Sequence, residues 1–196
     1  MGYYPVQARN QYGVQYWENY QKYRSTPTGD SLTSKRISLV RSCHPAGLKL
    51  VDIGIGNGQF IDDYGPGAFG YDVNPRAIEW LCSKNIWLDP SHENPPSATF
   101  WDSLEHSERP GELIGKIDRF VFISIPIFTG LDHVLRSKHF KKDEHFWYFT
   151  ERGLGGWLGR RGFELVTKNR MEEECGREDI GTFVFKRVSE APPELW

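Results

Sequence analysis

The chain has 196 residues, a formal net charge of −2 and an isoelectric point near 6.3. This length fits one domain with a single sizeable core, and the near-neutral charge gives no reason to expect a nucleic-acid backbone as partner. Three scattered cysteines suit a reducing compartment, and no apolar run approaches the roughly 20 residues that span a bilayer. We therefore expect a cytoplasmic protein that does not enter a membrane.

The first segment of the chain, residues 1–29, is rich in aromatic residues. It carries six tyrosines among polar residues, namely Tyr3, Tyr4, Tyr12, Tyr16, Tyr20 and Tyr23. We expect a partly helical arm that either covers a binding pocket as a lid or forms a surface helix or an oligomer contact. Asp30 or Ser31 is then expected to cap a helix that runs to about Cys43, with Arg36 in the middle of its apolar face.

Strands and helices alternate over the middle of the chain. Strands are expected at residues 48–53, 68–71, 86–88, 98–101 and 119–125. Short helices are expected at residues 59–64 and about 75–84, the second capped by Asn74 with Pro75 at its first position. The segment at 119–125 is nearly all apolar, which predicts burial on both faces of a sheet.

The last third of the chain begins with an expected long loop over residues 126–149. Thr150 is then predicted to cap a helix that ends at Gly162, and two strands follow at 163–168 and 182–187. The whole pattern predicts a doubly wound α/β domain over residues 30–188. Its sheet is mostly parallel, with helices on both faces and one antiparallel edge strand. Residues 189–196 are expected to form a loose tail.

A glycine-rich turn follows the first strand, where α/β sheets of this kind bind their ligands. Gly54, Gly56 and Gly58 remove side chains from this turn and let the backbone approach a ligand closely. A dinucleotide fingerprint would need glycine at position 59 or 61, where the chain has Gln59 and Ile61. No Gly-Lys-Ser/Thr sequence follows either, so the spacing excludes the usual phosphate-binding loops.

Two carboxylates beside this turn indicate which ligand it binds. Asp52 would repel a pyrophosphate but suits the ammonium group of an amino acid. Asp72 ends the second strand, where it can accept hydrogen bonds from the two hydroxyls of a ribose. A ligand with a ribose, a cationic amino-acid end and no phosphate describes S-adenosylmethionine (SAM).

Residues 51–58 and 70–74 resemble the corresponding segments of class I SAM-dependent methyltransferases, and the similarity extends over residues 30–188. The resemblance implies a seven-stranded sheet in the order 3-2-1-4-5-7-6. It also implies that Gly54 and Gly56 contact the methionine part of SAM, that Asp72 binds the ribose and that Val73 packs near the adenine.

Residues 100–106 resemble the fourth-strand motif of a subgroup that includes ubiquinone-biosynthesis O-methyltransferases. The resemblance implies methyl transfer to oxygen of a small molecule, with Asp102 and Ser103 beside the methionine end of SAM. Glu105 or His106 could act as general base for an acceptor hydroxyl. Alternatively, Asp102, Glu105 and His106 hold the divalent metal that the resemblance associates with this pattern, or Glu105 and His106 merely cap and solvate a helix start.

Arg36 needs a partner, because an unpaired charge on an apolar helix face is costly. One candidate is the carboxylate of SAM, which a guanidinium can bind in a bidentate manner. The other is a structural ion pair with Asp52, Asp62 or Asp63.

The segment 131–146 follows the fifth strand and is expected to line the acceptor pocket. It carries three histidines, each of which is either a base or a packing residue: His133, His139 and His145. We take His145, together with Glu105 and His106, as the candidate catalytic residues.

Two rival functions remain open. A nucleic-acid methyltransferase would use the basic residues of the same segment, namely Arg136, Lys138, Lys141 and Lys142, although a solvated face explains them equally. Residues 94–97 (Asn-Pro-Pro-Ser) resemble the motif of base-modifying amino-methyltransferases, but Ser97 replaces the aromatic residue and the motif precedes the fourth strand. The second rival is a SAM-binding subunit without catalytic activity.

Overall fold

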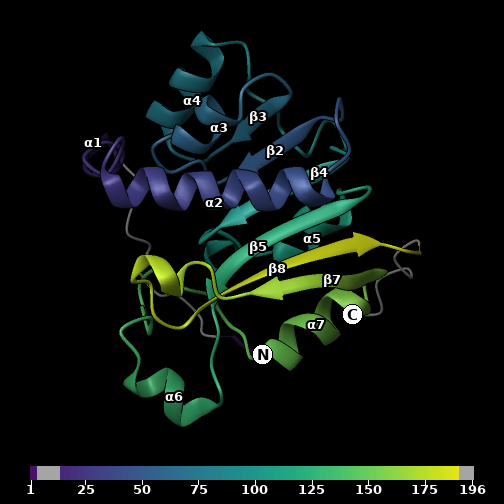
Figure 1. Ribbon diagram of the computed structural model, residues 1–196. Coiled ribbons are helices and arrows are strands. Elements are labelled where there is room, and N and C mark those ends of the chain that lie inside the picture. Colours follow the sequence, from purple (N-terminus) through teal and green to yellow (C-terminus); the bar gives the residue numbers. More distant parts are fainter. Residues whose placement is uncertain (4–13, 190–196) are drawn as a thin grey trace.

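A computed structural model describes residues 1–3 and 14–189; Tyr4, Tyr12 and most of the predicted tail lie outside the described residues. The centre of the molecule is a six-stranded sheet in the order β3-β2-β4-β5-β8-β7 (Figure 1). Its strands are β2 (Leu50–Ile53), β3 (Ala68–Tyr71), β4 (Ser97–Trp101), β5 (Phe120–Pro126), β7 (Phe163–Asn169) and β8 (Ile180–Arg187).

The predicted α/β topology is confirmed, with one strand fewer than expected. Strands β3, β2, β4 and β5 are parallel, and antiparallel pairing lies at the predicted edge, where β8 runs opposite to both β5 and β7. The expected strand at 86–88 is wrong, because this segment makes only a single parallel bridge from Trp87 to Gly70. Pro90 follows closely and has no N–H to donate, so the pairing cannot continue.

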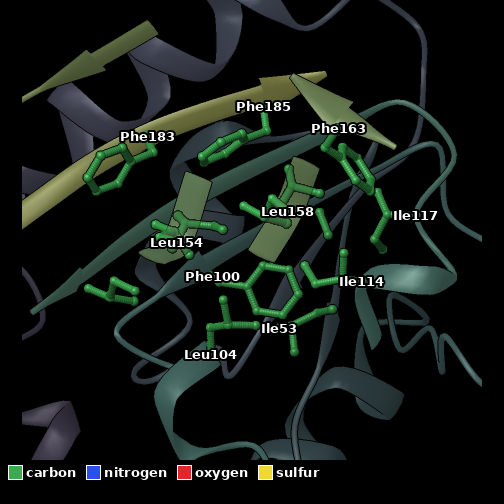
Figure 2. Packing of buried hydrophobic residues seen from close by; sticks show 14 of the residues in the cluster. Ile53, Phe100, Leu104, Ile114, Ile117, Leu154, Leu158, Phe163, Phe183 and Phe185 are labelled. Carbon is green, nitrogen blue, oxygen red and sulfur yellow. The ribbon is translucent and has the colours of Figure 1, made fainter. Parts of the chain in front are cut away.

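The side chains of β5 alternate between the two faces of the sheet, and every residue of this strand is buried, as predicted. Phe120 and Phe122 pack with the helices α2 (Pro27–Cys43), α3 (Gln59–Tyr64) and α4 (Pro75–Ser83). Val121, Ile123 and Ile125 pack on the other face with α5 (Pro110–Gly115) and α7 (Glu151–Gly159). Figure 2 shows this second layer, in which Phe100, Leu154 and Leu158 meet Phe183 and Phe185.

Two of the three predicted helix caps are confirmed. Asn74 accepts a hydrogen bond from the backbone N–H of Arg76 at 2.9 Å, and Thr150 accepts one from Gly153 at 3.0 Å. The predicted cap of α2 at Asp30 or Ser31 is wrong, because Thr26 caps this helix by accepting from Gly29 at 3.1 Å. Pro27 then occupies the first position, where a residue without an N–H costs nothing, and the helix begins one turn earlier than expected.

The sequence predicts a long loop over residues 126–149, but the structure shows a helix and a short strand in this segment. It contains α6 (Leu131–Arg136), which stands away from the sheet in Figure 1, and β6 (Trp147–Tyr148). β6 pairs with β1 (Gly2–Tyr3), a partner from the far end of the chain that no local pattern could indicate. The predicted helical part of the N-terminal arm is α1 (Val14–Gln21).

The remaining elements are the short 3-10 helices η1 (Leu104–His106) and η2 (Glu173–Cys175). Within residues 1–3 and 14–189, the helices are too short or too polar to cross a membrane.

Removing the Phe100 ring tests the core shown in Figure 2. The side chain is fully buried, so Phe100→Ala should lower the free energy of unfolding by about 3–5 kcal/mol, measured by urea denaturation. Tyr23→Ala serves as the control, since 66% of Tyr23 is exposed and its loss should cost less than about 1 kcal/mol. Equal losses in the two variants would contradict the assignment of Phe100 to the core.

Candidate functional site

The glycine-rich turn lies at the carboxyl end of β2 and packs tightly against neighbouring side chains. Gly54 and Gly58 have φ angles of +79° and +74°, a conformation that favours glycine. A Cβ atom on Gly54 would lie 2.6 Å from the Cβ of Ser103, and one on Gly58 would lie 2.6 Å from the ring of Trp80. These glycines are therefore required by the packing of the protein itself, in addition to the predicted approach of a ligand.

The Asp72 carboxylate holds this turn in place from the end of β3. One of its oxygens accepts a hydrogen bond from the backbone N–H of Ile55 at 3.0 Å, and the other accepts from Asn74 at 2.8 Å. Burial raises the pKa of Asp72, and these N–H groups act in the opposite direction. The residue is only half-buried and each oxygen has a second lone pair, so the carboxylate can still accept bonds from a ligand. Val73 beside it is 64% exposed and offers an apolar surface.

Asp52 lies on the face of the sheet that α2 covers, and it is buried. Its carboxylate accepts a hydrogen bond from the Thr99 hydroxyl of the neighbouring strand β4 at 2.6 Å. Burial raises the pKa of Asp52 to about 7, against the lowering effects of the Thr99 hydrogen bond and the Arg36 charge. The predicted carboxylate thus lies below the turn, and nearby charges such as that of Arg36 affect its ionisation.

A network of two arginines and two carboxylates joins three distant parts of the chain. Arg36 of α2 binds Glu172 at 2.6 Å and approaches Asp102 to 3.4 Å, while its guanidinium lies 4.9 Å from the centre of the Trp101 ring. Arg177 binds Asp102 at 2.7 Å and also contacts Glu172, whose side chain has no exposed surface. The four charges balance one another, as buried ion pairs require.

The structure corrects the predicted partners of Arg36. Asp62 pairs instead with Arg24 and Lys84, and Asp63 accepts a hydrogen bond from Gln59. The ion-pair partner of Arg36 within the protein is Glu172, which belongs to the connection between β7 and β8, 136 positions further along the chain; the pairing of Arg36 with the carboxylate of SAM stays a prediction. Sequence reasoning missed Glu172 and Arg177, because neither lies in a recognisable motif.

Asp102 and Ser103 occupy the carboxyl end of β4, directly beside the glycine turn. Asp102 has a φ angle of +56°, a left-handed conformation that aspartate tolerates better than most residues. Burial opposes its ionisation, yet the charge and hydrogen bond of Arg177 hold the pKa of Asp102 below its ordinary value. The Ser103 hydroxyl donates to the backbone carbonyl of Ile53, so the two predicted cofactor residues are held in one orientation.

Helix α1 lies over the glycine turn. Gln21 and Arg24 donate hydrogen bonds to the backbone carbonyl of Asn57 at 3.3 and 3.0 Å. A Cβ atom on Gly56 would lie 3.4 Å from the Tyr20 ring. Helix α1 and the residues that follow it are therefore in contact with the glycine turn.

The three predicted catalytic residues lie together at the start of η1 and in the segment before β6. One ligand atom from each of Glu105, His106 and His145 lies within 4.8 Å of the other two, and we call this group the Glu-His-His cluster. The two imidazole rings meet edge to face with their centres 4.5 Å apart. Glu105 and His145 are buried, with 2% and 3% of their surfaces exposed.

The protonation of this cluster follows from its burial. Burial and the nearby Asp102 charge raise the pKa of Glu105. Burial lowers the pKa of His106 to about 4 and that of His145 to about 3, so both imidazoles are neutral at physiological pH.

The other two histidines of the predicted pocket wall turn away from the cluster. His133 accepts from the Thr129 N–H at 3.2 Å and lies 3.4 Å from the Asp179 carboxylate. His139 shares a hydrogen bond with the backbone carbonyl of Glu178 at 3.0 Å. Of the three histidines, the structure therefore brings only His145 to the candidate site.

The features proposed for nucleic-acid binding do not gather at this site. Residues 94–96 precede β4 and Ser97 is its first residue, so this motif lies at the amino end of the strands, opposite the glycine turn. In the basic segment, Lys138 pairs with Glu178 at 3.0 Å and Lys141 pairs with Glu144 at 3.0 Å. Their charges are therefore balanced within the protein.

Comparisons with known proteins agree with this geometry. A sequence model of the methyltransferase domain matches residues 20–168. No curated protein sequence matches the chain significantly.

Three solved structures share the fold at low sequence identity. Magnesium protoporphyrin IX methyltransferase from Synechocystis, with bound S-adenosylhomocysteine (SAH), has a TM-score of 0.63 and 13% identity over 92% of this chain and 98% of that chain. For the 1,6-didemethyltoxoflavin-N1-methyltransferase of Burkholderia thailandensis, with bound 1,6-didemethyltoxoflavin and SAH, the TM-score is 0.62 and the identity 14%, over 88% and 85%. A putative methyltransferase from Haloferax volcanii, in complex with the Trm112 methyltransferase activator, has a TM-score of 0.63 and 10% identity over 93% and 98%.

The raised pKa of Asp52 predicts a pH-dependent stability. The folded state holds the Asp52 proton more tightly than the unfolded state, so its contribution is complete below about pH 4 and disappears as the pH rises to about 7. Asp52→Asn cannot lose a proton. Between pH 5 and pH 8 the unfolding free energy of the wild type should therefore fall by about 3 kcal/mol relative to this variant.

Urea denaturation at a series of pH values measures this difference. Asp132→Asn, which changes an exposed aspartate, is the matched control. Parallel pH profiles for the wild type and Asp52→Asn would show that Asp52 ionises normally in the folded protein.

Proposed function

The chain belongs to the family of methyltransferase domains, and we propose that it transfers a methyl group from SAM to an oxygen atom of a small-molecule acceptor. The observation that carries this proposal is the covered glycine turn. The turn lies at the carboxyl end of β2, is held by Asp72 and lies beneath α1. Two of the structures with the same fold contain SAH, the product that SAM leaves after methyl transfer.

The residues at this site fit SAM. We assign the backbone of Gly54 and Gly56, which carry no side chains, to the methionine part, and the half-buried Asp72 can accept hydrogen bonds from the ribose. Exposed Val73 offers its side chain to the adenine ring. When bound, SAM supplies a methyl group on a positively charged sulfur.

The remaining cofactor candidates act beside these contacts. Asp102 and Ser103 face the same pocket from the end of β4, and we assign Arg36 the role of fixing Asp102 in its left-handed conformation. Asp52 lies buried behind the turn, where the positive charge of the SAM ammonium group would favour its ionised form over the protonated form that burial favours.

The Glu-His-His cluster is the proposed acceptor side of the site. Its residues Glu105 and His106 closely follow Asp102 and Ser103 in the chain, and its neutral imidazoles can accept a hydrogen bond from an acceptor hydroxyl and orient it. Helix α1 over the turn limits the access of water during the reaction. A small acceptor is favoured over a nucleic acid, because two of the four basic side chains of this segment, Lys138 and Lys141, are paired with carboxylates of the protein.

Calorimetric titration with SAH tests the cofactor assignment. The wild type should bind SAH, and Asp72→Ala should weaken binding by at least about 1 kcal/mol through loss of charged hydrogen bonds. Asp118→Ala, at an exposed position, should leave the affinity unchanged. An unchanged affinity in Asp72→Ala would exclude the ribose assignment.

Transfer of a radiolabelled methyl group from SAM tests the reaction itself. A panel of phenols, catechols, carboxylic acids and amines should show label on a hydroxyl-bearing acceptor. His145→Ala should then lower kcat about 100-fold or more, while His139→Ala retains it. Label that appears on RNA or DNA would favour the nucleic-acid alternative. Binding of SAH without transfer to any acceptor would favour a SAM-binding subunit.

A further inference from the structure

The Glu-His-His cluster presents the donor atoms of a metal site. It combines one carboxylate and two imidazoles, and one ligand atom from each lies within 4.8 Å of the others. Two nitrogen ligands and one oxygen ligand form the set that catalytic zinc sites use when they keep a fourth position open. The three residues come from two segments about 40 positions apart, and the tertiary fold brings them together.

Glu105 supplies a second and independent observation. Only 2% of this residue is exposed, and its Oε2 atom is buried without a hydrogen-bond partner among the described residues. A buried carboxyl oxygen without a partner costs free energy, which a bound cation would recover. His145 is buried beside it, in contact with the His106 ring.

The ligand set differs from the Asp102, Glu105 and His106 set considered from the sequence. The Asp102 carboxylate is engaged by Arg177 at 2.7 Å and by Arg36 at 3.4 Å. Two guanidinium groups at this carboxylate compete with a cation, so Asp102 is a poor ligand. His145 takes its place in the cluster.

The surroundings leave the cluster open to a cation. The charge of Lys141 acts on all three residues, and this lysine pairs with Glu144 at 3.0 Å. The backbone carbonyl of Glu144 accepts a hydrogen bond from one ring N–H of His106. Such an outer contact orients a metal-binding imidazole and leaves its other nitrogen for the metal.

We propose that Glu105, His106 and His145 bind a divalent transition-metal ion, Zn²⁺, with at least one coordination position open to an oxygen atom of the acceptor. Two imidazole ligands favour Zn²⁺ over Mg²⁺, which prefers oxygen ligands. The role of this ion rests on the proposed function. It would orient an acceptor hydroxyl beside the cofactor site and lower the pKa of that hydroxyl.

Zinc titration of the full-length protein tests the site without any methyl-transfer assay. Protein freed of metal with a chelator should bind one Zn²⁺ per chain by calorimetry, with a Kd on the order of 1 μM or tighter. Glu105→Gln and His145→Ala should each weaken this binding by at least roughly 100-fold, more than the loss of an outer contact costs. His139→Ala, on the same segment but outside the cluster, should bind as the wild type does.

Two further measurements make each outcome decisive. Far-UV circular dichroism and SAH binding of the metal-free variants show whether they are folded; His106→Asn replaces any variant that is not. Zn²⁺ should also raise the melting temperature of the wild type and leave that of the cluster variants unchanged. Three results would overturn the proposal. These are a wild type that does not bind Zn²⁺ at all, cluster variants that bind Zn²⁺ with the affinity of the wild type, and a wild type that binds Mg²⁺ as tightly as Zn²⁺. Retained SAH binding in that case would leave the proposed function intact.

Discussion

The buried ion network of Arg36, Glu172, Arg177 and Asp102 is the interaction on which the architecture of the site depends. It ties α2, the end of β4 and the β7–β8 connection to one another. Removing either arginine would leave the fully buried Glu172 carboxylate with one cationic partner in place of two, which costs more than the loss of an exposed pair. The network therefore holds the left-handed backbone at Asp102, and with it the direction in which η1 leaves the sheet.

The proposed cofactor side of the site depends on close packing between the backbone of the glycine turn and the side chains around it. The glycine turn packs against Ser103 and Trp80, and Asp72 binds the turn through a backbone N–H. Any ligand that Asp72 holds is therefore coupled to the conformation of the turn. Helix α1 adds a cover that contacts the same turn through Asn57. Together these contacts fix the conformation of the turn before a cofactor binds, which lowers the entropic cost of binding.

The proposed acceptor side is assembled from parts that are separate in the sequence. η1 supplies Glu105 and His106, whereas His145 comes from the segment that precedes β6. That segment is itself anchored by the pairing of β6 with β1 at the very start of the chain. The N-terminal region thus contributes to both sides of the site, through β1 at one and α1 at the other.

The sequence by itself determined the features that depend on neighbouring residues. The glycine turn, the position of Asp72 and the caps at Asn74 and Thr150 follow from local patterns, whereas the strand order was implied by the resemblance to a known family. The pairing of Arg36 with Glu172, the inward position of His145 and the β1–β6 pairing were decided only by the tertiary structure. The strand expected at residues 86–88 is a single bridge between Trp87 and Gly70 in the structure. Local patterns indicate periodicity and backbone preference. Contacts between residues more than 100 positions apart depend instead on which charges and side-chain volumes meet when the helices pack on the sheet.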